Sequence, residues 1–152
     1  MKRIIIFIII VCVLTILIIS SVNFDEYYLI LKGTEKEIKI STNGNDTFII
    51  SYTHSVALTK VYEYYRISDN KIVLYKMEFF DQCAGLPTET IDEEEFIMEN
   101  GKFIITKMDR EFEYINYRVN SKYEFKLDIK DDEVNLSNVF GDDLVILSLR
   151  RR

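Results

Sequence analysis

Short strand-like runs separated by tight turns are the feature that most limits how this chain can fold. From Tyr27 onward, apolar and polar residues alternate with a period of two, as they do along strands that bury one face. Phenylalanine and tyrosine each occur ten times, and β-branched residues are frequent, which favours strand over helix. The connections are too short for crossover helices, so neighbouring strands are expected to pair antiparallel. The sequence therefore predicts an all-β fold, an antiparallel β-sandwich or barrel of about nine strands.

Glycine and asparagine mark the predicted turns. Gly33 separates two strand-like runs near the start of this region, and Asn43-Gly44 is expected to form a hairpin leading into residues 47–54. Asn100-Gly101 is the strongest hairpin signal in the chain. The run "REFEYINYRV", residues 110–119, is expected to form one strand.

An uncharged apolar segment opens the chain. Two cationic residues precede an apolar run from Ile4 to Ile19, and the next charged residue is Asp25. This run is long enough to cross a bilayer once, and the preceding cations favour a cytoplasmic N-terminus. No small-x-small cleavage site follows, which favours a retained anchor over a cleaved signal peptide. We expect residues 1–24 to form one transmembrane helix, as a membrane anchor or uncleaved signal segment, and residues 25–152 to form one extracytoplasmic β-domain of a single-pass cell-membrane protein.

Composition removes several classes of function from consideration. All 25 acidic residues lie after residue 24, and no stretch alternates basic and aromatic residues, so nucleic-acid binding is not expected. One histidine and one cysteine beyond the leader do not supply a zinc site of usual composition, and no glycine-rich phosphate loop is present. We therefore expect neither a metal nor a cofactor. The basic cluster at residues 149–152 is either a solvated tail or a contact with anionic lipid headgroups.

His54 and Cys83 are the candidates for catalysis. His54 and Ser55 are adjacent in a strand-like run, so they point to opposite faces, and a serine–histidine dyad would need a bulge. Acidic residues follow Cys83 closely and disfavour a reactive thiolate. No catalytic residue is assigned on this basis. A cysteine-dependent hydrolase or transferase using Cys83 and His54 is retained as an alternative.

Glu63 is unusual because it lies in an apolar and aromatic run. If residues 55–58 form the loop after the strand that ends at His54, then His54 and Glu63 share one face, roughly 13 Å apart along the strand. A carboxylate on such a face needs a charged or hydrogen-bonding partner, and Lys60, Arg66 and His54 are close in sequence. A solvated face is the alternative. The other residues predicted for this face are Ile50, Tyr52, Val61 and Tyr65.

The segment "FFDQCAGLPTET", residues 79–90, interrupts the strand pattern. It contains the only proline of the chain together with small residues that permit a tight backbone. Loops of this kind carry function or form structural corners, and both interpretations stay open. Just beyond it, Thr90 with Glu93 three residues later either begins a helical turn or belongs to a charged loop.

The strand-like region with Tyr52, His54 and Glu63, taken together with the loop at residues 79–90, resembles the bacterial domain-of-unknown-function 1850 family. The family pattern is an aromatic residue, His-Ser-Val, a glutamate about nine residues later, and a Gly-Ala-Gly-Leu-Pro loop after the next strand. Cys83 replaces the first glycine of that loop. The matching residues are Tyr52, His54, Ser55, Val56, Glu63, Ala84, Gly85, Leu86 and Pro87.

The resemblance implies a small exported or membrane-anchored protein that accompanies transporters of the TRAP class with TAXI-type binding proteins. The expected function is that of a non-enzymatic accessory protein in solute uptake. It would bind a transporter subunit, a TAXI-type solute-binding protein or a small ligand through the matching residues and Cys83. A structural cell-envelope module, in which His54 and Glu63 satisfy one another in the core, is the alternative.

Overall fold

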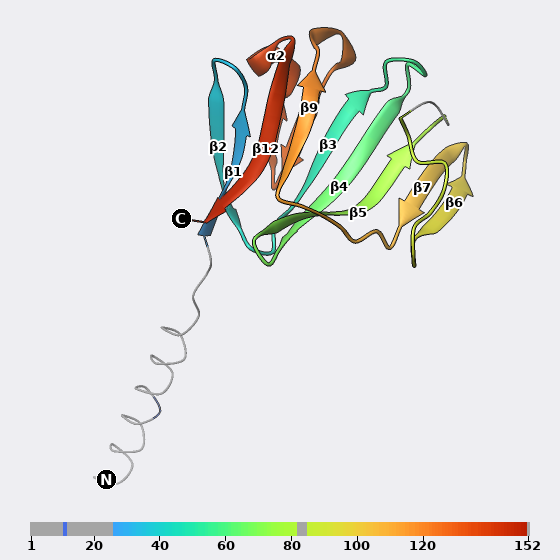
Figure 1. Cartoon of the computed structure of the whole chain (residues 1–152), viewed down its shortest axis with the longest axis horizontal. Coiled ribbons are helices and arrows are strands. Elements are labelled where there is room, and N and C mark those ends of the chain that lie inside the picture. The colour runs from blue at the N-terminus through green and yellow to red at the C-terminus, as the bar shows by residue number, and fades with distance from the viewer. Residues whose placement is uncertain (1–10, 12–25, 82–84, 152) are drawn as a thin grey trace.

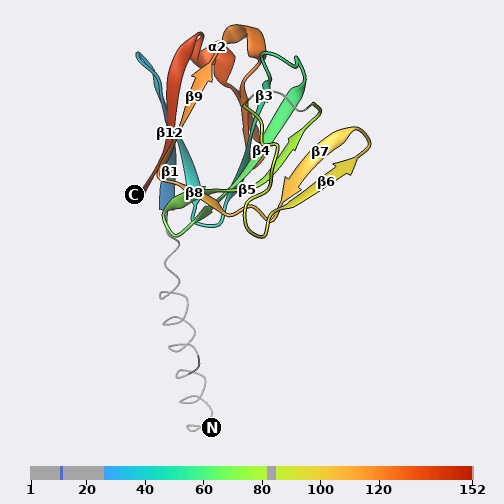
Figure 2. The same cartoon turned by 45° about the vertical axis from the view of Figure 1, so that its right-hand side comes forward.

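The computed structural model describes Val11, residues 26–81 and residues 85–151 (Figure 1). Except for Val11, the leader for which an N-terminal transmembrane helix is predicted lies outside the described residues. Within the described ranges, no helix has the length and apolar character needed to cross a bilayer. The described residues from 26 onward form two antiparallel sheets that face each other across one core (Figure 2).

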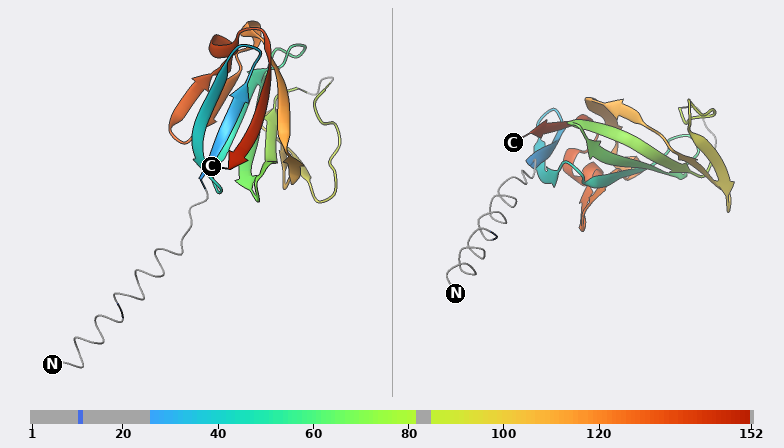
Figure 3. Two further views of the ribbon diagram at one scale, coloured as in Figure 1. Left: turned by 60° about the vertical axis from the view of Figure 1, so that its left-hand side comes forward. Right: turned by 90° about the horizontal axis from the view of Figure 1, so that it is seen from below.

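The smaller sheet has four strands in the order β2-β1-β12-β9. Its strands are β1 (Glu26–Lys32), β2 (Glu37–Asn43), β9 (Tyr114–Val119) and β12 (Asp143–Arg151). β1 pairs with β12 so that Tyr27 lies opposite Arg151, which brings the end of β12 beside the start of β1 (Figure 3). β12 thus continues through Arg151 as a paired strand. One of the two expectations for this basic cluster was a solvated tail, and the pairing through Arg151 differs from it.

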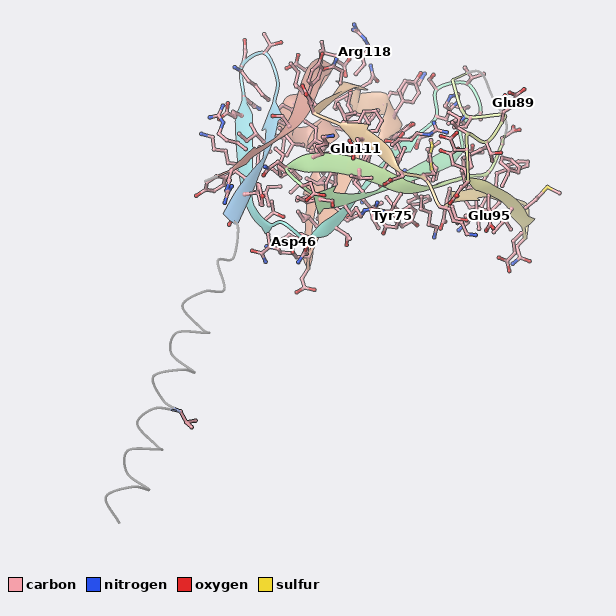
Figure 4. All side chains as sticks on the ribbon, turned by 60° about the horizontal axis from the view of Figure 1, so that its bottom comes forward. Asp46, Tyr75, Glu89, Glu95, Glu111 and Arg118 are labelled. Carbon is pink, nitrogen blue, oxygen red and sulfur yellow. The ribbon has the colours of Figure 1, made fainter. Side chains whose placement is uncertain are left out.

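The larger sheet runs in the order β11-β10-β3-β4-β5-β7-β6, and β8 pairs with β5 beside this path. Its strands are β3 (Thr47–Thr53), β4 (Lys60–Ser68), β5 (Lys71–Phe79), β6 (Glu95–Glu99), β7 (Lys102–Thr106), β8 (Arg110–Phe112), β10 (Lys126–Ile129) and β11 (Asp132–Asn135). The short helices of the described chain are the 3-10 helix η1 (Ser121–Tyr123) and the α-helix α2 (Leu136–Phe140). In Figure 4, Asp46 lies near the turn before β3, and Glu95 lies far from it on the edge strand β6.

The core lies between the sheets because each strand turns alternate residues inward. The smaller sheet contributes Leu29 and Leu147, and the larger sheet contributes Phe48, Ile50 and Leu127, all fully or almost fully buried. This arrangement confirms the predicted all-β antiparallel fold, with twelve strands where about nine were expected.

The Asn100-Gly101 hairpin is confirmed. β6 and β7 pair with Glu99 opposite Lys102, and both turn residues have positive φ, 53° at Asn100 and 76° at Gly101. This is the left-handed backbone that a two-residue hairpin turn requires. The Gly33 turn is confirmed as well, since β1 and β2 pair directly.

The prediction of a hairpin at Asn43-Gly44 is wrong. The chain does turn there, and the Asp46 N–H donates to the Asn43 carbonyl at 3.1 Å. However, β2 pairs with β1 and β3 pairs with β4 and β10, so this turn carries the chain from the smaller sheet to the larger one. The Asp46 carboxylate fixes the turn by accepting from the Asn43 N–H and the Thr42 hydroxyl. The Tyr27 ring lies so close to Gly44 that an added Cβ would sit 3.1 Å from it.

The single strand predicted over residues 110–119 is divided between the sheets. β8 pairs with β5 in the larger sheet, whereas β9 pairs with β12 in the smaller one. Two successive exposed residues, Glu113 and Tyr114, separate half-buried Phe112 from inward-facing Ile115 and Tyr117. This interruption in the alternation is the local signal of the crossing.

Two short segments outside the strands complete the comparison between prediction and structure. Residues 91–94 form a charged turn in which the Ile91 N–H donates to the Glu94 carboxylate at 3.0 Å, so the second interpretation of the Thr90 segment holds. The helix α2 was not predicted, although Asn135 caps it by accepting from the Asn138 N–H at 2.9 Å. Gly141 ends α2 with a φ of 66°.

Candidate functional site

The β3–β4 hairpin places the residues singled out in the sequence. Tyr52 lies opposite Val61, Ile50 lies opposite Glu63, and the His54 N–H donates to the Thr59 carbonyl at 2.8 Å. Residues 55–58 therefore form the loop, as predicted. Because side chains alternate along each strand, Tyr52 and Glu63 both point to the inner face, which confirms the predicted face.

The Glu63 carboxylate accepts hydrogen bonds from three tyrosines. The Tyr52 hydroxyl donates to Oε1 at 3.1 Å, and the hydroxyls of Tyr65 and Tyr117 donate to Oε2 at 2.9 Å and 2.5 Å. The Tyr65 and Tyr117 oxygens are also 2.7 Å apart. We call these four residues the tyrosine–glutamate cluster. Since Tyr117 comes from β9 and the other three come from β3 and β4, the cluster connects the two sheets.

The cationic partners considered for Glu63 bind elsewhere. Lys60 forms an ion pair with Glu124 at 2.6 Å, and Arg66 forms one with Asp109 at 2.6 Å. Among the described residues, no lysine or arginine forms an ion pair with Glu63. The expectation of a partnered, inward-facing carboxylate is thus confirmed, with neutral hydroxyl donors as the partners.

Burial dominates the electrostatics of the cluster. It raises the pKa of Glu63 above its usual value, against the opposing effect of the hydrogen bonds from Tyr117, Tyr65 and Tyr52. Burial, followed by the charge of Glu63, likewise raises the pKa of each of these tyrosines. Glu63 nevertheless keeps some accessible surface, because one side of the cluster faces a cavity.

This cavity, which we call the Glu63 groove, has a volume of about 430 Å³. Its apolar walls are formed by Leu74, Met77, Phe112, Ile115 and Phe125. Arg110 also lines it, but its guanidinium donates to both carboxylate oxygens of Glu94, at 2.7 and 2.8 Å. A second cavity of about 270 Å³ extends toward His54 and shares Tyr52, Phe125 and Arg118 with the groove.

Residues of the predicted 79–90 loop border the Glu63 groove. Gly85, with a φ of 94°, and Pro87 line it, and Leu86 is buried in the core. The structure thus brings this part of the loop to the same place as Tyr52 and Glu63. Cys83 and Ala84 lie outside the described residues.

His54 closes the loop that follows β3. It is almost fully buried, its Nδ1 accepts from the N–H groups of Val56 at 3.4 Å and Ala57 at 3.2 Å, and its carbonyl accepts from Leu58 at 2.9 Å. A ring nitrogen that accepts two hydrogen bonds carries no proton, so a neutral His54 is protonated on Nε2. Ser55 and Val56 are exposed at the tip of the loop.

This arrangement predicts that His54 acts as a turn-forming side chain. Changing His54 to alanine removes the acceptor for the two N–H groups and is expected to lower the free energy of unfolding by about 1–2 kcal/mol. Asparagine is expected to recover about half of this loss, because its side-chain oxygen accepts from N–H groups two or three residues later. Urea unfolding followed by circular dichroism measures both variants. Equal losses for alanine and asparagine would contradict this role.

Sequence reasoning missed two residues of the site, Tyr117 and Phe125. Tyr117 donates the shortest hydrogen bond to Glu63, and the Phe125 ring stacks on Tyr52 with centroids 4.9 Å apart and an interplanar angle of 11°. Tyr117 does occupy an inward position in the period of β9, but nothing local relates it to Glu63. In the part of the chain that the structure describes, no three His, Cys, Asp or Glu residues are grouped closely enough to hold a metal ion.

Fold and site together define a small antiparallel β-domain in which a partly buried carboxylate, held by tyrosines from both sheets, faces a groove of about 430 Å³. Comparison with protein families gives the family itself. The model described as "Domain of unknown function (DUF1850)" matches residues 48–136, more than half of the chain, and the chain belongs to this family. The match contains both the β3–β4 hairpin and the tyrosine–glutamate cluster. No curated protein and no solved structure matches the chain.

Proposed function

We propose that this protein is a non-enzymatic binding module that serves a TRAP-type transporter of the TAXI class. In this proposal, residues 1–24 hold the β-domain at the outer side of the cytoplasmic membrane. The domain binds a transporter subunit, a TAXI-type solute-binding protein or a small ligand. The tether keeps it at high local concentration beside its partner.

The Glu63 groove is the observation that carries the binding role. Its volume of about 430 Å³ lies in the range of small-molecule sites, and it combines apolar walls with a few convergent polar groups. The polar groups are already engaged with one another, since the tyrosines donate to Glu63 and Arg110 is paired with Glu94. A preorganised site of this kind suits recognition, because its groups keep their positions without a ligand.

Other features support the proposed location of the β-domain and its proposed transporter partner. The apolar run after two N-terminal cations supports an outward-facing domain, and the strongly acidic composition beyond residue 24 supports a partner other than nucleic acid. The transporter association is supported by what the family resemblance implies.

Site-specific photo-crosslinking in the native membrane tests the proposal. A photoreactive amino acid at Ser55, on the loop beside the groove, is expected to cross-link a TRAP permease subunit or a TAXI-type binding protein, identified by mass spectrometry. The same label at Asn45 is the matched control, because both positions are exposed and β3 separates them. We expect at least fivefold less product from Asn45. If neither position yields one of these proteins, the proposal is wrong.

A further inference from the structure

We propose that the Glu63 groove binds a small ligand through an organic ammonium group. The groove holds a carboxylate for which the described chain provides no counter-ion, surrounded by aromatic rings. This inference rests on the binding role proposed above and names the chemical class of the ligand.

Glu63 differs from the other poorly accessible glutamates in the partners of its carboxylate. Glu78 is 6% exposed and forms ion pairs with Lys76 at 2.5 Å and Lys102 at 2.7 Å. Glu94, with a side chain 5% exposed, is bound by the Arg110 guanidinium. The protein thus neutralises both of these carboxylates with its own cations, whereas Glu63 receives only neutral hydroxyl donors among the described residues. A buried carboxylate without a cation is costly, and a cationic ligand would remove that cost.

Aromatic side chains surround the Glu63 carboxylate. Tyr52 and Phe125 stack, and Tyr117 meets Phe125 edge to face with centroids 6.2 Å apart. These rings line the groove on the side of Glu63. Aromatic faces attract ammonium groups, more strongly where water is excluded, so the rings and the carboxylate favour the same charge.

Two cationic side chains, Arg110 and Arg118, also line the groove. Arg110 is neutralised by its two hydrogen bonds to Glu94. Arg118 is exposed where it lines the groove from β9, so water screens its charge. Among the described residues, the titratable groups that face Glu63 directly are the hydroxyls of Tyr52, Tyr65 and Tyr117.

A consequence of this site is that binding should be coupled to proton release. Burial raises the pKa of Glu63, whereas an ammonium group beside the carboxylate would lower it. A ligand that arrives at a pH where Glu63 is partly protonated therefore displaces a proton. The affinity should rise with pH until Glu63 is fully ionised, and it should not change further before the amine itself titrates.

Titration calorimetry on the full-length protein tests the inference with benzylamine, choline and 1,4-diaminobutane as ammonium probes. Benzyl alcohol and benzoate are the neutral and anionic controls. We expect at least one ammonium probe to bind, and benzylamine to bind at least tenfold more tightly than either control. Repeating the titration in buffers of different ionisation enthalpy is expected to show release of up to one proton. If no ammonium probe binds, or if the controls bind equally well, the inference is overturned.

Two variants assign the effect to Glu63. Glu63→Gln keeps the shape but removes the charge, and it is expected to lower the affinity for the ammonium probe at least tenfold. Glu111→Gln is the control because Glu111 carries the same charge on β8, is exposed and does not line the groove (Figure 4). Its affinity is expected to stay within twofold of the original. Unchanged affinity in Glu63→Gln overturns the inference. If that variant does not fold, proton release on binding by the unsubstituted protein supports the inference, and binding without proton release overturns it.

The outcome is separable from that of the proposed function. Cross-linking from Ser55 reports on the transporter partner and does not depend on the ligand. A protein that cross-links but binds no ammonium probe would refute the ligand class alone.

Discussion

Replacement of Phe79 by alanine is expected to lower the free energy of unfolding by about 3–5 kcal/mol, which is typical for deletion of a buried aromatic ring. The Phe79 side chain is completely buried at the end of β5. Its ring stacks on Phe103 with centroids 5.6 Å apart and meets Phe96 edge to face at 6.5 Å. The substitution would therefore leave a cavity where the β6–β7 hairpin joins the rest of the larger sheet. Urea unfolding followed by circular dichroism measures the loss.

The next residue provides the matched control. Phe80 has the same side chain but is 42% exposed, and the Lys102 ammonium lies over its ring, 5.5 Å from the centroid. Since an exposed cation–π contact is worth about 0.5–1 kcal/mol, Phe80→Ala is expected to cost about 1 kcal/mol or less. Similar losses for the two variants would show that the β6–β7 hairpin is not held by Phe79.

Glu63→Gln is expected to change how stability depends on pH. Because the pKa of Glu63 is raised in the folded state, the folded protein binds this proton more tightly than the unfolded chain does. The contribution of Glu63 to stability is therefore fully present below the unfolded pKa and declines as pH rises through the folded pKa. One proton corresponds to a slope of at most about 1.4 kcal/mol per pH unit. The glutamine variant lacks this decline, so it should gain stability relative to the original protein as pH rises above the unfolded pKa.

Glu78→Gln is the control because the opposite trend is expected. Burial acts to raise the pKa of Glu78, but Lys102 and Lys76 together lower it below its usual value. Its ion pairs therefore stabilise the fold above the unfolded pKa, and that contribution is lost as pH falls through the folded pKa. The deficit of Glu78→Gln should be largest near neutral pH and should shrink in acid. If the difference between Glu63→Gln and the original protein stays constant as pH rises above the unfolded pKa, the assigned direction for Glu63 is wrong.

The local parts of this fold were accessible from the sequence because they depend on period and turn chemistry. The register of the β3–β4 hairpin, the inner face with Tyr52 and Glu63, and the Asn100-Gly101 turn all follow from residues close in the chain. The points at which the chain passes from one sheet to the other do not follow from residues close in the chain. At Asn43-Gly44 and again at Glu113, the turn or strand signal is present, but the pairing partner is fixed by distant strands.

The candidate site shows the same division. Glu63 was recognisable as an acidic residue on an apolar face, and Tyr52 and Tyr65 follow from parity within the hairpin. Tyr117 lies 54 residues further along the chain and reaches Glu63 only because β9 belongs to the opposite sheet. No local pattern gives that contact, so cations nearby in sequence were the natural candidates and were wrong.

The position of β12 between β1 and β9 determines when this domain can become complete as the chain is synthesised. β1 precedes all the other described strands and β12 follows them, yet β9 reaches the smaller sheet only by pairing with β12. Until residues 143–151 have been synthesised, β9 has no neighbouring strand to hold Tyr117 over Glu63. The larger sheet can begin to assemble from the residues that precede β12, whereas the tyrosine–glutamate cluster is completed only when β12 has joined the smaller sheet.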